Sequence, residues 1–290
     1  MNHHVRHGES STASFLLEIT PESAGWQHCG LRVAALEAGG SVTFTLDDAE
    51  AVLLSLGGAA VVECDGQTFE LTGRRDVFDG PSDQVYVPRG ATTTVSSAAG
   101  GRFAIASARC EAVLPVRYMP ATDVPVELRG AGQASRQVNN FGVPGVLEAD
   151  RLIACEVLTP GGNWSSYPPH KHDEERDGET RLEEIYYFEV APGPSGPGVA
   201  YQRVYGHEGA EIDVLAEIRD GDVVTIPHGW HGPSMAVPGY DLYYLNVMAG
   251  PGEERAWLIC DDPAHAWVRD TWEDQAVDSR LPFAREGGNR

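Results

Sequence analysis

Short runs of apolar and β-branched residues follow one another along the first third of the chain, and turn residues separate them. The turn signals include Ala38-Gly39-Gly40, Asp65-Gly66 and Arg89-Gly90. The runs lie at 31–36, 41–46, 51–56, 59–64, 68–71, 84–87, 92–95 and 102–107. Each has the length and composition of a β-strand. Strands that recur about every 8–12 residues are typical of an all-β sandwich or barrel.

The segment from about 112 to 141 interrupts this rhythm. It contains Pro115, Pro120, Pro125 and a Gly-Ala-Gly run, which together predict a linker. The strand pattern then resumes, and the pattern at 270–280 allows one short helix. The later runs lie at 151–157, 184–190, 199–205, 210–214, 222–226 and 241–247.

Two segments in different halves of the chain resemble each other. Residues 83–90 (DQVYVPRG) and 222–229 (DVVTIPHG) both combine a strand with Pro, one further residue and Gly. This internal repeat predicts two jelly-roll-like β-barrels in tandem. We therefore expect a first barrel at 25–125 and a second at 126–290, after a poorly ordered N-terminus at 1–24.

The charge and cysteine content limit the function classes. A formal net charge of -22 in 290 residues argues against a nucleic-acid or anionic membrane surface, because both require clustered Lys and Arg. The five cysteines are widely spaced, which favours free thiols in a reducing compartment. Glycines interrupt the longest apolar stretch, and the N-terminus lacks the apolar core of a secretory signal. We expect a cytoplasmic protein with no nucleic-acid or membrane partner.

The second half contains the residues that can bind a metal. His170 and His172 are two positions apart, so an extended chain places both imidazoles on one face, where they can hold one divalent ion. Glu183 or Glu184, but not both, can point the same way from the start of the next strand. A later strand ends in Pro-His-Gly-Trp-His, which presents His231 after a turn.

The order His-x-His, Glu, then Gly-x(5)-Pro-x-Gly-x-His resembles the two metal motifs of the cupin superfamily. A loop widens the gap before the Glu, and the second motif is one residue shorter than its commonest form. These departures match one family in particular. Several segments of this chain resemble sequence blocks of that family. They are 161–174, 182–188, 202–205 and 239–250 in the second half, and 73–78 and 85–90 in the first.

On these blocks the chain, from about 25 to 268, resembles the 5-deoxy-glucuronate isomerases of myo-inositol catabolism. The resemblance implies a bicupin with a single metal site in its C-terminal barrel. The ligands it implies are His170, His172, Glu184 and His231, with Glu184 preferred to Glu183 because it opens the Glu-x-Tyr strand pattern. Three imidazoles and one carboxylate suit Zn²⁺, Mn²⁺, Fe²⁺ or Ni²⁺ without selecting among them.

The implied reaction is an aldose–ketose isomerisation of 5-deoxy-D-glucuronate to 5-dehydro-2-deoxy-D-gluconate through a metal-stabilised enediolate. The substrate would be a small sugar acid, and we expect Arg203 to hold its carboxylate bidentately. Tyr186 shares the face of Glu184 and is the candidate for positioning a substrate oxygen or relaying a proton. Tyr244 and Asn246 are further candidates for substrate contact, although the aromatic run at 240–244 fits core packing equally well.

Three further expectations stay open at this stage. The chain could be another metal-dependent cupin enzyme, such as a dioxygenase, or a non-catalytic cupin that binds a sugar acid. The first barrel lacks a comparable His set, so a structural or dimerising role is expected for it, and a homodimer is plausible because barrel edges are exposed. The acidic loop 173–180 is expected to be a solvated turn or a segment that closes over the site.

Overall fold

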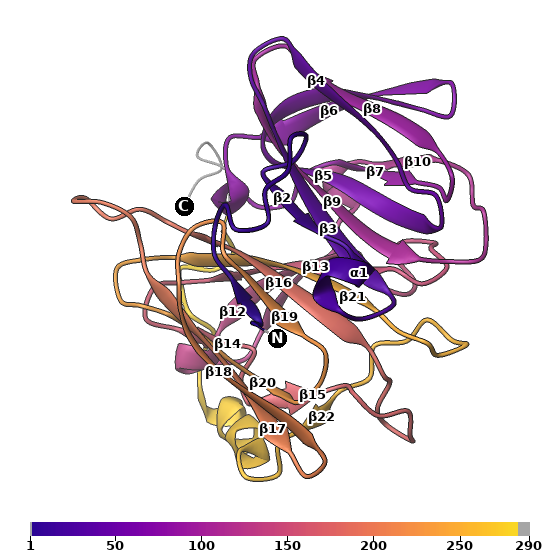
Figure 1. The fold of residues 1–290 in the computed structure, drawn as a ribbon. Coiled ribbons are helices and arrows are strands. Elements are labelled where there is room, and N and C mark those ends of the chain that lie inside the picture. Colours follow the sequence, from indigo (N-terminus) through magenta and orange to yellow (C-terminus); the bar gives the residue numbers. More distant parts are fainter. Residues whose placement is uncertain (1, 284–290) are drawn as a thin grey trace.

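The computed structural model describes residues 2–283, and strands dominate it (Figure 1). Most strands of the first half form one unit, which Figure 1 shows above the second. The elements of this unit are β2 (Leu17–Ile19), α1 (Pro21–Ala24), β3 (Cys29–Leu36), β4 (Gly40–Thr45), β5 (Ala49–Cys64), β6 (Gln67–Arg74), η1 (Val77–Asp79), β7 (Gln84–Val87), β8 (Thr92–Ser97), β9 (Gly101–Arg109) and β10 (Arg117–Met119).

Two sheets face each other in the second unit. The seven-stranded sheet has the order β1-β19-β16-β21-β13-β12-β11, and the other has the order β18-β17-β20-β15-β22, with β14 beside β20. Its elements are β1 (His4–Val5), β11 (Val126–Arg129), β12 (Arg136–Gly142), β13 (Ile153–Thr159), β14 (Trp164–Ser165), β15 (His170–Lys171), β16 (Glu183–Val190), β17 (Ala200–His207), β18 (Ala210–Ile218), β19 (Val223–Ile226), β20 (Trp230–Ala236), β21 (Leu242–Ala249) and β22 (Cys260–Asp261). The predicted all-β fold is confirmed.

Alternation along the strands of the seven-stranded sheet divides the core into layers. On β16, Tyr186 and Phe188 point into the second unit, whereas Ile185 and Tyr187 point toward the first. Strands β13 and β21 alternate in the same way, so apolar side chains cover both faces of this sheet. A third apolar cluster fills the interior of the first unit. The sheet that carries the candidate site is therefore packed on both sides.

The two strands expected at 51–56 and 59–64 are one continuous strand, β5. The pairing register of β5 shifts between Ser55 and Gly57 and again between Gly58 and Ala60, so the glycines form a bulge rather than a turn. A side chain at Gly58 would lie 2.7 Å from the carbonyl oxygen of Gly100, and its φ is +100°. Glycine therefore lets the strand bend while it pairs with both layers of the first unit.

The expectation of a poorly ordered N-terminus is wrong for residues 2–24. Strand β1 pairs antiparallel with β19 of the second unit, with His4 opposite Val224. Asp222 anchors this segment, because its carboxylate accepts from the His7 amide at 2.9 Å and lies 3.0 Å from Nε2 of His4. The chain therefore begins in the second unit before it enters the first, as the indigo ribbon shows (Figure 1). Residue 1 lies outside the described residues.

The segment expected to be a linker carries strands and two short 3-10 turns, η2 (Ala121–Asp123) and η3 (Gly132–Ala134). Strand β10 belongs to the first unit and β11 to the second, so the crossover lies between Met119 and Val126. The helix allowed at 270–280 is instead a 3-10 helix, η4 (Ala266–Asp274). Residues 284–290 of the predicted second barrel lie outside the described residues. None of the helices in the described part is long and apolar enough to cross a membrane.

Candidate metal centre and adjoining cavity

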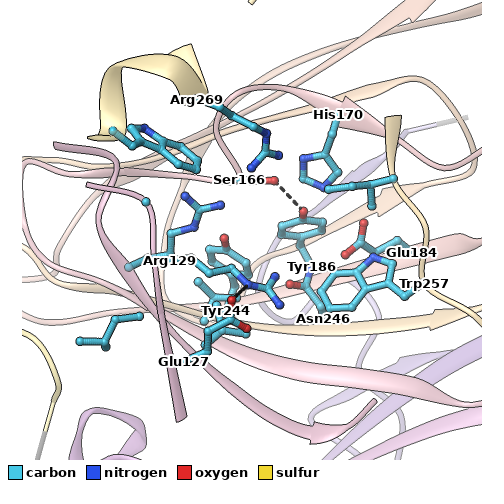
Figure 2. Close-up of a pocket in the computed structure, with 17 residues that line it drawn as sticks. Glu127, Arg129, Ser166, His170, Glu184, Tyr186, Tyr244, Asn246, Trp257 and Arg269 are labelled. Atoms are coloured by element: carbon cyan, nitrogen blue, oxygen red, sulfur yellow. Dashed lines mark hydrogen bonds and ion pairs between the residues drawn. The ribbon is translucent and has the colours of Figure 1, made fainter. Parts of the chain in front are cut away.

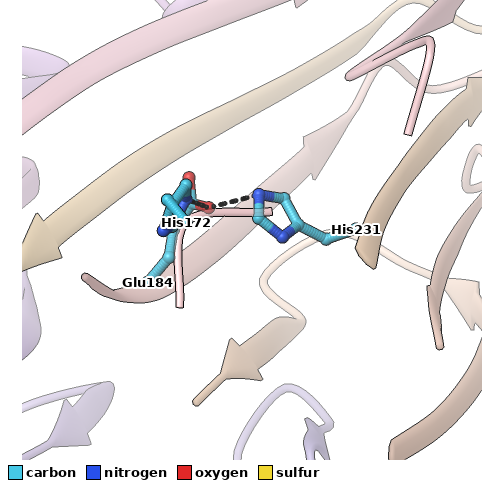
Figure 3. Close-up of side chains that lie close together, drawn as sticks. All are labelled: His172, Glu184 and His231. Carbon is cyan, nitrogen blue, oxygen red and sulfur yellow. Dashed lines mark hydrogen bonds and ion pairs between the residues drawn. The ribbon is translucent and has the colours of Figure 1, made fainter. Parts of the chain in front are cut away.

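Three of the four predicted ligands converge inside the second unit. His172 follows β15, Glu184 lies near the start of β16 and His231 lies on β20. One ligand atom from each lies within 4.8 Å of the others, and all three residues are buried. Oε2 of Glu184 is 3.0 Å from Nε2 of His172 and 3.1 Å from Nε2 of His231 (Figure 3).

His170, the fourth predicted ligand, lies beside this trio. It is paired with His231 across β15 and β20. Its ring centroid is 4.5 Å from that of His231 and 6.3 Å from that of His172. The structure therefore brings His170 to the edge of the cluster.

All three imidazoles use Nδ1 to contact a backbone carbonyl oxygen. The partners are Pro168 at 3.4 Å from His170, Leu182 at 3.2 Å from His172 and Gly229 at 3.1 Å from His231. A carbonyl only accepts, so Nδ1 carries the proton and Nε2 keeps its lone pair. In the described part of the chain, Nε2 of His231 is buried without a hydrogen-bond partner. An inward set of Nε2 atoms with one carboxylate is the donor set of a divalent transition metal.

The protonation states of the site agree with that donor set. Burial lowers the pKa of His170 well below its ordinary value, and the neighbouring His231 and His172 lower it further, so this imidazole stays neutral. Burial opposes ionisation of Glu184, but the adjacent His172 and His231 outweigh it and lower its pKa, and Glu184 in turn raises the pKa of His172. The neutral imidazole of His170 and the ionised carboxylate of Glu184 are in the forms that bind a metal.

The structure separates the roles of the two adjacent glutamates. Glu184 faces the histidines, whereas the carboxylate of Glu183 accepts from the backbone amides of Gln27 at 2.9 Å and His28 at 2.7 Å. Neighbouring residues of a strand face opposite sides, so only one of them reaches the cluster. This geometry agrees with the preference for Glu184.

The acidic loop 173–180 is exposed to solvent at 174–178, as expected of a solvated turn, but its two ends are held by hydrogen bonds and ion pairs. Lys171 is buried, and its Nζ donates to Asp173 at 2.7 Å and to Glu179 at 2.8 Å. Asp173 also accepts from the Gly229 amide and contacts Nε2 of His207, both within 2.8 Å. These contacts join the loop after His172 to the turn before His231. They hold two metal-binding segments at a fixed separation.

A cavity of about 460 Å³ adjoins the cluster, and His170 and Glu184 form part of its wall. In Figure 2 these two residues lie on one side of the cavity, and Arg129 and Arg269 lie on the other. The indole of Trp257 covers the part next to Glu184. The cavity is therefore large enough for a small sugar acid and touches the candidate metal ligands at one end.

Tyr186, Tyr244 and Asn246 all line this cavity, and for Tyr186 the strand alternation predicted this. The Tyr186 hydroxyl is 3.0 Å from Oγ of Ser166, and burial raises the pKa of Tyr186 well above its ordinary value. Within residues 2–283, the buried Nδ2 of Asn246 has no hydrogen-bond partner. A buried donor without an acceptor is costly, so a bound ligand is its natural partner.

The assignment of Arg203 to the substrate carboxylate is wrong. Arg203 lies on the face of β17 opposite to the buried Gln202 and Val204, and does not line the cavity. Its guanidinium instead pairs with the exposed Asp213 and donates to the carbonyl of Val214. The choice of Arg203 followed its charge alone, whereas the two-residue alternation of the strand points it away from the site.

Sequence reasoning also missed residues that line the cavity. Arg129 and Arg136 lie in the segment interpreted as a linker, and Arg269 lies in η4. Ser166 has a left-handed backbone with φ of 50°, which is strained for a residue that is not glycine. Arg136 and Val138 both line the cavity, so the alternation of β12 was the available signal. The prolines and glycines nearby concealed it.

The first unit offers no comparable centre. Its interior is filled by apolar side chains, among them Phe44, Leu53, Val62 and Phe103. Among the described residues, the one grouping of three potential metal-binding side chains is that of His172, Glu184 and His231. The second unit alone therefore carries the candidate centre.

Comparison with known proteins agrees with this geometry. A family model described as the KduI/IolB family matches residues 3–268. The chain belongs to the KduI/IolB family. A 5-deoxy-glucuronate isomerase of Geobacillus kaustophilus is 41% identical to this family member over 259 residues, which cover 88% of this chain and 91% of the relative. The resemblance drawn from the sequence blocks is confirmed at the level of the family.

Comparison with solved structures supports the same family assignment. An IolB-like protein from Salmonella typhimurium superimposes with a TM-score of 0.85 and 36% identity, covering 92% of this chain and 99% of the other. Oxalate decarboxylase from Lactobacillus farciminis aligns with a TM-score of 0.62 over 90% of this chain and 88% of its own. At 12% identity the latter likeness concerns the fold alone. The KduI/IolB chain therefore shares its two-unit architecture with a cupin decarboxylase.

Proposed function

We propose that this chain is a 5-deoxy-glucuronate isomerase that converts 5-deoxy-D-glucuronate to 5-dehydro-2-deoxy-D-gluconate in myo-inositol catabolism. The observation that carries the proposal is the convergence of His172, Glu184 and His231 at one end of a cavity lined by arginines. A relative with 41% identity over most of both chains bears that name.

One divalent ion would be held by His170, His172, Glu184 and His231. The support is the inward Nε2 set described above, in which Nε2 of His172 and Nε2 of His231 both approach Oε2 of Glu184. When bound, such an ion supplies a Lewis acid that polarises a carbonyl oxygen and stabilises the negative charge that develops on it. The donor set suits zinc, manganese, iron or nickel, and metal analysis of the purified protein distinguishes them.

The residues of the chain would bind the sugar and move its protons. Aldose–ketose isomerisation shifts one proton between adjacent carbons and a second between their oxygens, so it needs no electron acceptor. Tyr186 and Ser166, with hydroxyls 3.0 Å apart beside His170, would handle the proton between the oxygens. Nδ2 of Asn246 would donate to a substrate hydroxyl, and the rings of Tyr186 and Tyr244 would form the floor.

The cellular setting is part of the same proposal. We propose a cytoplasmic enzyme whose partner is the small anionic sugar acid. A homodimer is supported by the edge strand β11, on which Val126 is 45% and Leu128 is 38% exposed. Sedimentation of the purified chain gives the oligomeric state, and a monomer at micromolar concentration would refute the dimer.

The deciding experiment is direct conversion. Purified protein, analysed for metal, is incubated with 5-deoxy-D-glucuronate, and the ketose product is followed by chromatography. Product should form, stop after a chelator and return after the metal is restored. It should form equally without oxygen, which an oxygenase would not do. No product at any metal loading refutes the proposal.

A further inference from the structure

Three guanidinium groups line the cavity of a chain whose formal net charge is -22. Two of them are already paired. Nε of Arg129 lies 2.8 Å from Glu127, and Nη2 of Arg269 lies 2.7 Å from Asp261. Each carboxylate neutralises its arginine, so neither cation needs a ligand.

Arg136 differs from both. The residue is 7% exposed, and no carboxylate in the described part of the chain lies within ion-pair distance of it. Its guanidinium carbon lies 5.6 Å from the ring centroid of Trp272, within the range of a cation–π contact. Burial lowers its pKa to about 10, helped by Arg129 and Arg269, so it remains a cation at neutral pH. A buried cation without a counter-ion is destabilising unless a bound anion supplies one.

The hydrogen bonds of Arg136 show where that anion would bind. Both hydrogen bonds of Arg136 come from Nη1, which donates to the carbonyl oxygens of Ala134 at 3.1 Å and Tyr167 at 3.4 Å. Among residues 2–283 no acceptor faces Nε or Nη2. These two atoms form one edge of the guanidinium, and that edge matches the two oxygens of a carboxylate. Arg136 lines the same cavity as His170 and Glu184, so an anion on its free edge would share that cavity with the candidate metal centre.

We propose that Arg136 binds the carboxylate of the substrate through its Nε and Nη2 edge, and thereby makes the site selective for sugar acids over neutral sugars. The inference rests on the proposed function. It assigns the two ends of the substrate, with the carbonyl end at the His–Glu cluster and the carboxylate at Arg136. Arg129 and Arg269 add positive potential but remain held by their own carboxylates.

The test compares metal-loaded wild type, Arg136→Gln and the matched control Arg203→Gln on two substrates. These are 5-deoxy-D-glucuronate and 5-deoxy-D-glucose, its neutral counterpart with a hydroxymethyl group in place of the carboxylate. Wild type should prefer the acid in kcat/KM. Arg136→Gln should reduce that preference about 100-fold, mostly through KM for the acid, because it removes a buried charge pair. Arg203→Gln should keep the preference.

The outcomes separate this inference from the proposed function. Failure of wild type to convert the acid refutes the proposed function. Conversion by wild type with an unchanged acid preference in Arg136→Gln overturns the role of Arg136, as does an equal loss on both substrates. A second variant, Arg136→Lys, keeps the buried charge and serves as the test if Arg136→Gln does not fold. It should raise KM for the acid about tenfold by losing the two-point contact, and an unchanged KM overturns the inference.

Discussion

At the scale of single residues, backbone carbonyls set the tautomers of the candidate metal ligands. Pro168, Leu182 and Gly229 accept from the three Nδ1 atoms, so the loops that carry these carbonyls also orient the rings. No second carboxylate is needed to fix the imidazoles. The single carboxylate of the candidate centre, Glu184, would then be free to compensate the charge of a bound ion.

Adjacent glutamates give a matched pair of variants for the metal site. Glu184→Gln removes the carboxylate that faces two histidines, so metal affinity should fall at least about 100-fold. Glu183→Gln should keep the metal, because its carboxylate contacts the amides of Gln27 and His28 instead. It should lower the free energy of unfolding by about 1–3 kcal/mol through those lost hydrogen bonds.

Elemental mass spectrometry after dialysis against a weak chelator measures the retained metal, and urea unfolding measures stability. Full metal retention in Glu184→Gln would contradict its role as a ligand. Metal loss in Glu183→Gln together with retention in Glu184→Gln would exchange the two assignments.

Two neighbouring tyrosines give a second pair. Tyr186→Phe removes the hydroxyl that contacts Ser166 in the cavity, so kcat should fall about 100-fold with little change in KM. Tyr187 points to the opposite face, where its hydroxyl donates to Glu189 at 3.0 Å, and Tyr187→Phe should retain kcat. Steady-state kinetics of both variants with the sugar acid measures kcat and KM and tests this prediction. If Tyr186→Phe retained the kcat of the wild type, the Tyr186 hydroxyl would have no role in proton transfer.

At the scale of elements, the sequence predicted strands wherever alternation was local and uninterrupted. It placed Glu184 and Tyr186 on one face of β16, and the structure agrees. It failed where a strand depends on a distant partner: β1 forms only because β19, more than 200 residues later in the same sheet, pairs with it. It also failed at β12, where nearby prolines and glycines dominate the local pattern and tertiary pairing overrides them.

The residues of the candidate site also divide into those that the local sequence pattern predicted and those that it could not predict. Motif spacing found the candidate cluster of His172, Glu184 and His231, with His170 at its edge, because two histidines in an extended segment must share a face. It could not find Arg136, because which cations remain unpaired depends on where Glu127 and Asp261 lie in space. Counter-ion pairing is a property of the folded chain and leaves no local pattern. The error at Arg203 has a different origin, because the alternation of β17 already points this residue away from the cavity, where it pairs with Asp213.

The N-terminal strand supplies a prediction at this scale. Asp222→Asn should weaken the contacts to His4 and to the His7 and Arg219 amides, and lower the free energy of unfolding by about 1–2 kcal/mol. Burial opposes ionisation of Asp222, but those hydrogen bonds outweigh it and lower its pKa. The stabilisation is therefore complete above the unfolded pKa of about 3.9 and disappears as pH falls through the lower folded pKa.

Urea unfolding of wild type and Asp222→Asn between pH 3 and pH 7 measures this dependence, and hydrogen exchange reports residues 2–9. The difference between the two proteins should be largest at pH 7 and shrink toward pH 3. A difference that grows on acidification would contradict the anchor, and unchanged exchange at residues 2–9 would show that Asp222 does not hold this strand.

At the scale of the whole molecule, the first unit serves as a wall for the second. Its outer sheet face packs against the seven-stranded sheet through residues such as Leu54, Ala106 and Leu245. Burial of both faces leaves the strands that carry Glu184, Tyr186 and Tyr244 little freedom to move, which keeps a cavity wall in a fixed geometry. This explains how a unit without a metal centre contributes to the site.

One buried ion pair joins the two units. Arg74 of the first unit pairs with Glu156 of the second, which also accepts from Tyr243 at 2.8 Å and Asn139 at 3.0 Å. Burial opposes the charge of Arg74, but Glu156 outweighs it and raises the pKa of the guanidinium. The guanidinium of Arg74 therefore stays charged at neutral pH.

Removing one partner of this ion pair should lower the free energy of unfolding more than removing both charges. Arg74→Met leaves Glu156 buried and unpaired, and should lower the free energy of unfolding by about 3–5 kcal/mol. The double variant Arg74→Met/Glu156→Gln should recover part of this loss, because the amide can still contact Tyr243 and Asn139 without a charge. Arg219→Met, at an exposed pair with Glu217, is the control and should cost less than about 1 kcal/mol.

Urea unfolding followed by fluorescence and circular dichroism measures all three variants. Coincident transitions would show that the units unfold together, as the shared apolar layer predicts. An Arg74→Met protein as stable as the Arg219→Met control would mean that the buried pair is not what holds the units in register. A double variant weaker than Arg74→Met alone would mean that the charge of Glu156 is satisfied by Tyr243 and Asn139 without the arginine.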